Sequence, residues 1–208
     1  MNKTIAMSLY GDLDMYKAGA IENIRIRKQF YPDWNIRIYV SEAMPELDCE
    51  TIVMGESLEH SGMFWRFLAL WDGITIVRDT DSRFNNKEVA AVKAWEKSRH
   101  IAHAMHDHDH HRCFPLFGGM FGVKGDYKTE GQSHSLQDLH RPLYRAMSLP
   151  EERVADMKWL QRYLWPYIEK DTLHHSSVPL KWNRQPFPLQ EEGYFVGQQH
   201  DDNGPVWA

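Results

Sequence analysis

Two aspartates, Asp79 and Asp81, stand one residue apart directly after an apolar stretch at 73–77 that predicts a buried strand. In open α/β sheets, ligands bind outside the carboxyl ends of the strands. A pair of carboxylates in that place can hold a hard divalent cation, which in turn can bridge the oxygens of a diphosphate. The alternative is an acidic turn between strand and helix, in which Asp81 or Ser82 caps a helix that begins near Lys87.

Three arginines could supply positive charge to the same place. Arg66 lies in a largely apolar segment, and Arg78 and Arg83 flank the two aspartates. A guanidinium beside a metal and diphosphate site can neutralise phosphate charge in bidentate fashion. The alternative is that each arginine pairs with a nearby carboxylate, which contributes little where the pair is exposed.

Histidines crowd into residues 105–111, and glycines interrupt the apolar run at 117–123. The histidines are either a solvated polar loop or part of a site. A structural zinc site requires three or four ligands in a defined geometry, which the run alone does not show. Glycine weakens a strand, so Gly118 and Gly119 indicate a place where a ligand or another backbone approaches closely.

The hydrophobic pattern predicts strands and helices in alternation, which is typical of a parallel α/β sheet. The strands are expected at 3–9, 36–40, 73–77 and 101–105, and the helices at 16–30, 63–70, 87–97, 136–147 and 151–169. Prolines recur toward the carboxyl end and predict loops with a few short extended pieces. The expected fold is a single α/β domain, with a mostly parallel sheet flanked by helices.

Composition excludes several classes of protein. The chain has 208 residues, 42% of them hydrophobic, and a formal net charge of −5. This balance excludes a basic nucleic-acid-coating protein and an acidic disordered one. Cys49 and Cys113 are too few for a disulfide scaffold or a four-cysteine zinc site. The first residues lack a signal-peptide core, and Arg66 and Asp72 break the apolar window at 63–77, so we expect a soluble, cytoplasmic protein without a membrane span.

Six motifs recur in the order and spacing of a known family. They are Ser8-Leu9-Tyr10-Gly11, Gly19-Ala20-Ile21-Glu22-Asn23, Tyr31-Pro32-Asp33-Trp34, Phe64-Trp65-Arg66-Phe67, Arg78-Asp79-Thr80-Asp81-Ser82-Arg83 and Gly118-Gly119-Met120-Phe121-Gly122. Residues 4–125 thereby resemble small GT-A-fold glycosyltransferases of bacteria, viruses and phages, which use nucleotide sugars and a metal-binding Asp-x-Asp. The resemblance implies a GT-A-like (Rossmann-like) domain over 1–208. It assigns the nucleotide sugar and metal to 1–125, and the acceptor and carboxyl-terminal loops to 126–208.

The resemblance implies a donor site. Asp79 and Asp81 would hold Mn²⁺ or Mg²⁺, with His174, favoured over the alternative His175, as the third ligand. In the family that histidine stands in a His-Asp-Ser string, which here reads His174-His175-Ser176 and lacks the aspartate. Nucleotide-sugar binding would involve the end of the first strand, the residues after it, two arginines and the glycine pair: Ser8, Tyr10, Tyr16, Arg66, Arg83, Gly118 and Gly119.

Catalytic roles are implied as well. Arg66 would reach the phosphates or the sugar and help to neutralise the leaving diphosphate. Asp107 matches an acidic position that binds sugar hydroxyls. Asp156 matches an acid that faces the acceptor, where a carboxylate can accept the hydroxyl proton. From the residues alone, Asp156 is equally well explained as a surface acid on the amphipathic helix at 151–169.

The resemblance therefore implies metal-dependent transfer of a sugar from a nucleoside diphosphate sugar, a UDP-sugar first among them, to a hydroxyl. The acceptor is a glycan or, for a phage-encoded chain in the host cytoplasm, a hydroxymethylated DNA base. The slightly basic segment 124–184 permits the DNA alternative. One rival is a catalytically inactive nucleotide- or metal-binding protein of the same fold. Another, a nucleotidyltransferase, would need a Gly-rich basic phosphate loop, which this sequence lacks.

Overall fold

Seven strands of the chain hydrogen-bond into one sheet, in the order β3-β2-β1-β4-β6-β5-β7. They are β1 (Lys3–Leu9), β2 (Asn35–Val40), β3 (Glu50–Val53), β4 (Ile74–Arg78), β5 (Ala102–His106), β6 (Met120–Lys124) and β7 (Thr172–Ser176). This computed structural model describes residues 2–11, 14–125, 136–190, 193–201 and 204–206. Within the described sheet β6 runs antiparallel to both neighbours, and the other pairings are parallel. The predicted α/β class with a mostly parallel sheet is confirmed.

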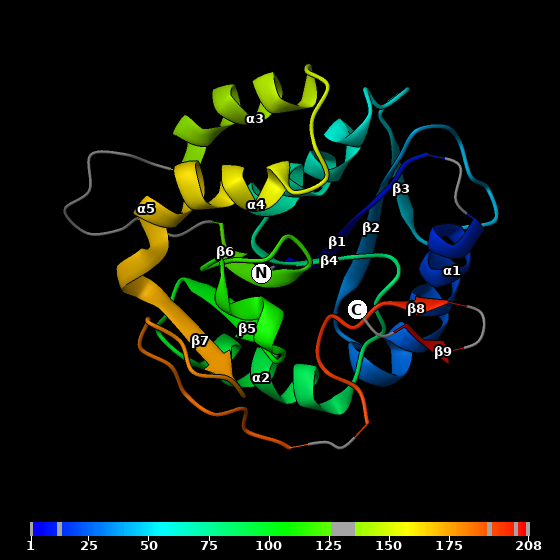
Figure 1. The fold of residues 1–208 in the computed structure, drawn as a ribbon. Coiled ribbons are helices and arrows are strands. Elements are labelled where there is room, and N and C mark those ends of the chain that lie inside the picture. Colours follow the sequence, from blue (N-terminus) through cyan, green and yellow to red (C-terminus); the bar gives the residue numbers. More distant parts are fainter. Residues whose placement is uncertain (1, 12–13, 126–135, 191–192, 202–203, 207–208) are drawn as a thin grey trace.

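Helices cover both faces of this sheet (Figure 1). They are α1 (Asp14–Phe30), η1 (His60–Trp71), α2 (Asn86–Lys97), η2 (Asp109–Arg112), η3 (Leu136–Leu139), α3 (His140–Met147), α4 (Ala155–Trp159), η4 (Leu160–Leu164), α5 (Trp165–Ile168) and η5 (Glu169–Asp171). The pair α1 and α2 packs on one face, and η1 with α3, α4 and α5 packs on the other. Among the described residues, no helix is both long enough and apolar enough to span a membrane. Strands β8 (His200–Asp201) and β9 (Gly204–Pro205) form a separate small hairpin.

The side-chain alternation of β1 explains this layering. Its odd-numbered apolar residues, such as Ile5 and Met7, pack toward α1 and α2, whereas Ala6 packs toward η1. Successive side chains of a strand point to opposite faces, so a run that is apolar throughout requires cover on both sides. The continuous apolar sequence of β1 therefore places it inside the sheet, with a helical layer on each face.

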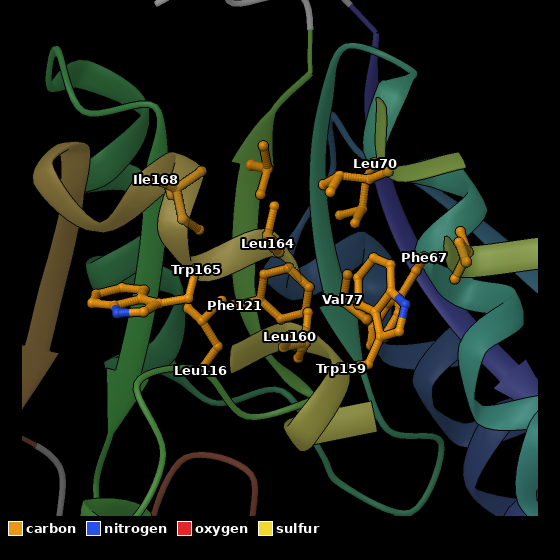
Figure 2. Packing of buried hydrophobic residues seen from close by; sticks show 14 of the residues in the cluster. Phe67, Leu70, Val77, Leu116, Phe121, Trp159, Leu160, Leu164, Trp165 and Ile168 are labelled. Carbon is orange, nitrogen blue, oxygen red and sulfur yellow. The ribbon is translucent and has the colours of Figure 1, made fainter. Parts of the chain in front are cut away.

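An aromatic cluster fixes α4 against η1 (Figure 2). The Phe67 ring meets the Phe121 ring edge-on at 5.7 Å and stacks on Trp159, also at 5.7 Å. Such ring pairs contribute about 0.5–1.5 kcal/mol beyond the area they bury. Because Arg66 precedes Phe67 and Asp156 lies one turn before Trp159, the cluster also sets where these two charged residues meet.

Three segments differ from the sequence-based expectation. The helix expected at 151–169 is divided into α4, the π-helical turn η4, and α5, which has a proline in its first turn. A proline lacks the N–H that continues a helix, and π-turns interrupt helices locally. The apolar run at 117–123 forms a strand only from Met120, because Gly118 and Gly119 form a turn before it. The buried strand β7, Thr-Leu-His-His-Ser, falls where loops and short extended pieces were expected.

The sheet topology gathers several loops at one edge. Because β1, β4 and β5 are parallel, their carboxyl ends meet there, and the antiparallel β6 contributes its amino end. Tyr10, Asp79, His108 and Gly119 follow or precede these strand ends. The loops at this edge therefore bring together four segments far apart in sequence. The division into a donor half at 1–125 and an acceptor half at 126–208 stays a prediction.

Candidate active site

A cavity of about 870 Å³ opens at this edge of the sheet. Its lining includes many residues expected at the site: Ser8, Tyr10, Tyr16, Arg66, Asp79, Asp81, Gly118, Gly119 and Asp156. The volume lies in the upper part of the range for small-molecule sites. The cavity is therefore large enough for a ligand of nucleotide-sugar size.

Arg66 stands at the centre of the charged part of the cavity. Its guanidinium pairs with Asp79 through Nη1, and with Asp156 through Nη2 at 2.9 Å from Oδ2. The Ser8 hydroxyl accepts a hydrogen bond from the Arg66 backbone N–H at 3.0 Å and fixes this part of η1 against β1. Burial opposes the charge of Arg66, but the two carboxylates more than offset it, so the pKa of the guanidinium is raised. Arg66 is therefore a permanent cation between the end of β4 and the start of α4.

Gly118 and Gly119 make room for this array. A Cβ on Gly118 would overlap the Asp156 carboxylate and lie 2.6 Å from Nη2 of Arg66, and one on Gly119 would overlap the Asp79 carboxylate. The sequence predicted a close approach at these glycines. The structure shows that the close groups are the protein's own carboxylates and the guanidinium.

Asp81 completes an acidic corner beside Asp79. Burial, together with the negative charge of Asp79, raises the pKa of Asp81 to about 7. Burial likewise raises the pKa of Asp156, against the opposing charge of Arg66. Three carboxylates thus share this corner with the Arg66 cation. The corner is electrostatically suited to additional positive charge.

The donor set at this corner fits Mn²⁺ or Mg²⁺. Both are hard cations that take carboxylate oxygens, and Mg²⁺ is commonly held by one or two carboxylates together with substrate phosphates and water. The Asp79 side chain is 45% exposed, so it is open to a ligand. Within the described ranges, no group of three or more His, Cys, Asp and Glu residues is placed to hold a metal ion. Asp79 and Asp81 are the two carboxylates of this corner that could serve as metal ligands.

His174 does not join these aspartates. It lies in β7, where its Nδ1 is 3.2 Å from Nε2 of His106 and its ring stacks on Trp182 at 5.8 Å. It is 3% exposed and does not line the cavity. The expected third ligand is thus packed into the far edge of the sheet, because β7 is separated from β4 by β6 and β5.

Asp107 and Arg83 also lie outside the cavity lining. Asp107 Oδ1 accepts hydrogen bonds from Lys87 Nζ and Ser177 Oγ, each at 2.5 Å, and its Oδ2 accepts one from the Val196 N–H at 2.9 Å. Both carboxylate oxygens thus accept hydrogen bonds from the protein, and through the Val196 N–H Asp107 holds the carboxyl-terminal segment. Arg83 donates to the carbonyls of its own turn, those of Thr80 and Ser82.

Arg78 pairs with a nearby carboxylate, which was the alternative to a role in phosphate binding. Its Nε donates to Glu88 Oε1 at 2.7 Å, and the Tyr31 hydroxyl donates to the same oxygen at 2.8 Å. Arg78 and Glu88 are both almost fully buried. The charge of Arg78 is therefore satisfied within the fold, where β4 meets α2.

Tyr10 and Tyr16 form the wall at the β1 end of the cavity. The Tyr10 ring packs edge-on against Trp65, with centroids 5.9 Å apart, and lies over Gly62. Burial raises the pKa of Tyr10 to about 12, so its hydroxyl stays protonated. This wall offers aromatic surface and hydroxyl donors beside the acidic corner.

Sequence reasoning missed most of the opposite wall. It includes the histidines after β5 and residues of the carboxyl-terminal segment: His108, His110, His111, Phe195, Gly197, Gln199 and Val206. The His-rich run indicated a possible site in the sequence, whereas the carboxyl-terminal segment did not, because loop sequences do not reveal where they return to the sheet.

Glu59, also in the lining, has a positive φ of 51°. A non-glycine residue in such a conformation is rare and often occurs at functional sites.

Comparison with protein-family models finds no match for this sequence, and comparison with curated proteins finds none either. Among solved structures the chain is similar to one described as a glycosyltransferase involved in the glycosylation of the major capsid of PBCV-1. The two chains share 16% identity with a TM-score of 0.48, over 85% of this chain and 82% of that one. At this identity the likeness concerns the chain trace and says nothing about activity.

Proposed function

We propose that this chain is a glycosyltransferase that moves a sugar from a nucleoside diphosphate sugar to a hydroxyl, with Mn²⁺ or Mg²⁺ at Asp79 and Asp81. The observation that carries this proposal is the Asp79–Arg66–Asp156 array beside Asp81, inside one cavity at the carboxyl ends of the strands. Such an edge is where open α/β sheets bind ligands. The family resemblance of residues 4–125 points the same way.

Asp79, Asp81 and Arg66 form the donor side of the proposed site. A divalent cation bound by the two aspartates would supply positive charge to the diphosphate oxygens. Arg66 supplies a second positive charge, and it is buried and fixed before the substrate arrives. Charge that is already oriented stabilises a leaving group without reorganisation cost. Tyr10 and Tyr16 lie on the β1 side, where we place the nucleoside.

Asp156 serves the acceptor side. Transfer breaks the bond between the anomeric carbon and the diphosphate oxygen and forms a bond to the acceptor oxygen, whose proton must leave. Asp156 lines the cavity, and burial raises its pKa, so it is a better proton acceptor than an exposed aspartate. The pair with Arg66 holds its Oδ2, and the Met157 N–H donates to Oδ1 at 2.8 Å. Asp156 is thus oriented before catalysis.

Thermal shift with a panel of nucleoside diphosphate sugars, each with and without Mn²⁺, tests the donor site. A ligand that binds only the folded chain raises its melting temperature. We expect a Mn²⁺-dependent shift for one donor, lost in Asp79→Ala and kept in Asp33→Ala, an exposed aspartate outside the cavity lining. A shift that survives in Asp79→Ala would refute the metal assignment.

Donor turnover separates an enzyme from a binding protein of the same fold. Wild type with the donor found above should release the nucleoside diphosphate slowly to water and faster when an acceptor is present. Asp156→Asn should keep the thermal shift and lose most of the release. Donor binding without any release would support the catalytically inactive alternative.

A further inference from the structure

The His-rich run forms a turn that faces the cavity. After β5 the chain enters η2, and three of its histidines, His108, His110 and His111, line the cavity. The donor groups of the proposed function lie at β1 and β4, whereas this turn follows β5, on the other side of the acidic corner. The turn is thus a distinct part of the same cavity, to which the proposed function gives no role.

Hydrogen bonds define which nitrogen of each ring carries the proton. His111 Nδ1 accepts from the backbone N–H groups of Asp107 and His108, at 3.1 and 3.2 Å. His108 Nδ1 accepts from the His110 N–H at 3.3 Å. A neutral imidazole that accepts at Nδ1 carries its proton on Nε2. Burial lowers the pKa of His111 to about 3, so this ring is neutral at physiological pH.

The two Nε2–H groups are available to a ligand. In the part of the chain that the structure describes, neither has a hydrogen-bond partner. The turn therefore presents N–H donors to the cavity, and a hydroxyl oxygen is a matching acceptor.

Two phenylalanines supply flat apolar surface next to these donors. The Phe195 ring stacks on His108 with centroids 4.6 Å apart and planes 26° from parallel. The Phe117 ring lies 5.0 Å from His111. Both phenylalanines are half-buried and line the cavity. Flat rings beside N–H donors are complementary to a pyranose, which has apolar C–H faces and hydroxyls at its rim.

The charge of the cavity disfavours a polyanion here. Acidic side chains outnumber arginines in its lining: they are Glu59, Asp79, Asp81 and Asp156, against Arg66 and Arg153. Proteins that bind duplex DNA neutralise its phosphates with clustered lysine and arginine. The acceptor that fits this wall is thus a neutral saccharide in preference to a DNA duplex.

We propose that His108, His111, Phe117 and Phe195 form the acceptor subsite, and that it binds the pyranose ring of a neutral saccharide. This inference rests on the proposed function, because it assigns the acceptor of that reaction. Phe195 comes from the carboxyl-terminal segment, which Asp107 fixes through the Val196 N–H. Asp107 therefore positions the subsite from outside the cavity.

Saturation-transfer NMR of the full chain with diamagnetic Mg²⁺ and the bound nucleoside diphosphate tests the subsite, with methyl glycosides of glucose, galactose and mannose as probes. At least one glycoside should bind. Phe195→Ala should weaken that binding about tenfold, as expected for a lost stacking contact. Tyr194→Ala is the matched control, because Tyr194 is exposed and does not line the cavity, and it should bind as wild type does.

Three results would overturn the subsite. They are no binding of any glycoside, equal binding by wild type and Phe195→Ala, and binding of a hydroxymethylcytosine duplex in place of the glycosides. Weaker binding of the nucleoside diphosphate in Phe195→Ala would also refute the subsite, because it would show that this wall contacts the donor and not the acceptor. Glycoside binding without sugar transfer from any donor would refute the proposed function alone and leave the subsite standing.

Discussion

The glycine at position 118 offers a direct test of the charged array. A Cβ there would overlap the Asp156 carboxylate and lie 2.6 Å from Nη2 of Arg66, so these two groups must move apart. Gly118→Ala should therefore break the buried pair between Arg66 and Asp156 while leaving the pair between Arg66 and Asp79. The backbone at 118 has no positive φ, so alanine is not strained there for conformational reasons.

The size of the effect follows from burial. The two side chains are 7% and 9% exposed, and a hydrogen bond between charged groups contributes about 1.5–3 kcal/mol. Replacing glycine by alanine at an unstrained position returns about 0.4–1 kcal/mol through the unfolded state. We expect Gly118→Ala to lower the free energy of unfolding by about 0.5–2.5 kcal/mol, from the difference of these two contributions.

Urea unfolding at pH 8, followed by tryptophan fluorescence, measures this loss in two backgrounds. In Asp156→Ala the carboxylate is absent, so adding Gly118→Ala should cost less than about 0.5 kcal/mol, a clear non-additivity. Gly122→Ala is the control, because its Cβ would meet Trp95 at 2.9 Å and its cost should be equal in both backgrounds. An equal cost of Gly118→Ala in both backgrounds would show that the glycine serves the backbone and not the ion pair.

Three further predictions concern other parts of the site. Asp107→Asn should loosen the carboxyl-terminal segment, seen as faster proteolysis near Val196 and a higher KM for acceptor with a smaller change in kcat; unchanged proteolysis would contradict this. The pKa of His111 is lowered to about 3 in the folded chain, so as pH falls the unfolded chain takes up a proton at this residue before the folded chain does. The free energy of unfolding should therefore fall below about pH 6.5, by about 1.4 kcal/mol per pH unit for this group. The fall should be smaller in His111→Gln. Asp81→Asn should abolish the Mn²⁺-dependent part of nucleoside diphosphate binding in calorimetry and leave the metal-independent part; binding that still responds to Mn²⁺ would exclude Asp81 as a ligand.

The sequence predicted a residue's place at the site where that place depends only on the end of a neighbouring strand. Asp79 and Asp81 directly follow a buried strand, and in a parallel sheet that place faces the ligand edge. Ser8 and Tyr10 were expected from the family resemblance, and they also lie at and after the end of a strand. The position of each relative to the sheet follows from local pattern, so no long-range contact had to be known.

Asp107 and His174 illustrate the opposite case. Asp107 also lies near a strand end, but its carboxylate is occupied by the Val196 N–H from 89 residues later in the chain. His174 lies in a strand whose polar sequence carries no apolar alternation, so neither β7 nor its distance from β4 could be inferred. Side chains whose partners come from distant loops are beyond what periodicity and spacing encode.

The identity of residue 66 connects the two sides of the proposed reaction. A lysine has a single ammonium, whereas the planar guanidinium of Arg66 directs Nη1 to Asp79 and Nη2 to Asp156 at once. Asp79 belongs to the donor side and Asp156 to the acceptor side, so one rigid group sets the distance between them. Because η1 holds Arg66 through the Ser8 hydroxyl, that distance is fixed by the sheet itself and not by either substrate. An arginine here is therefore required by geometry as well as by charge.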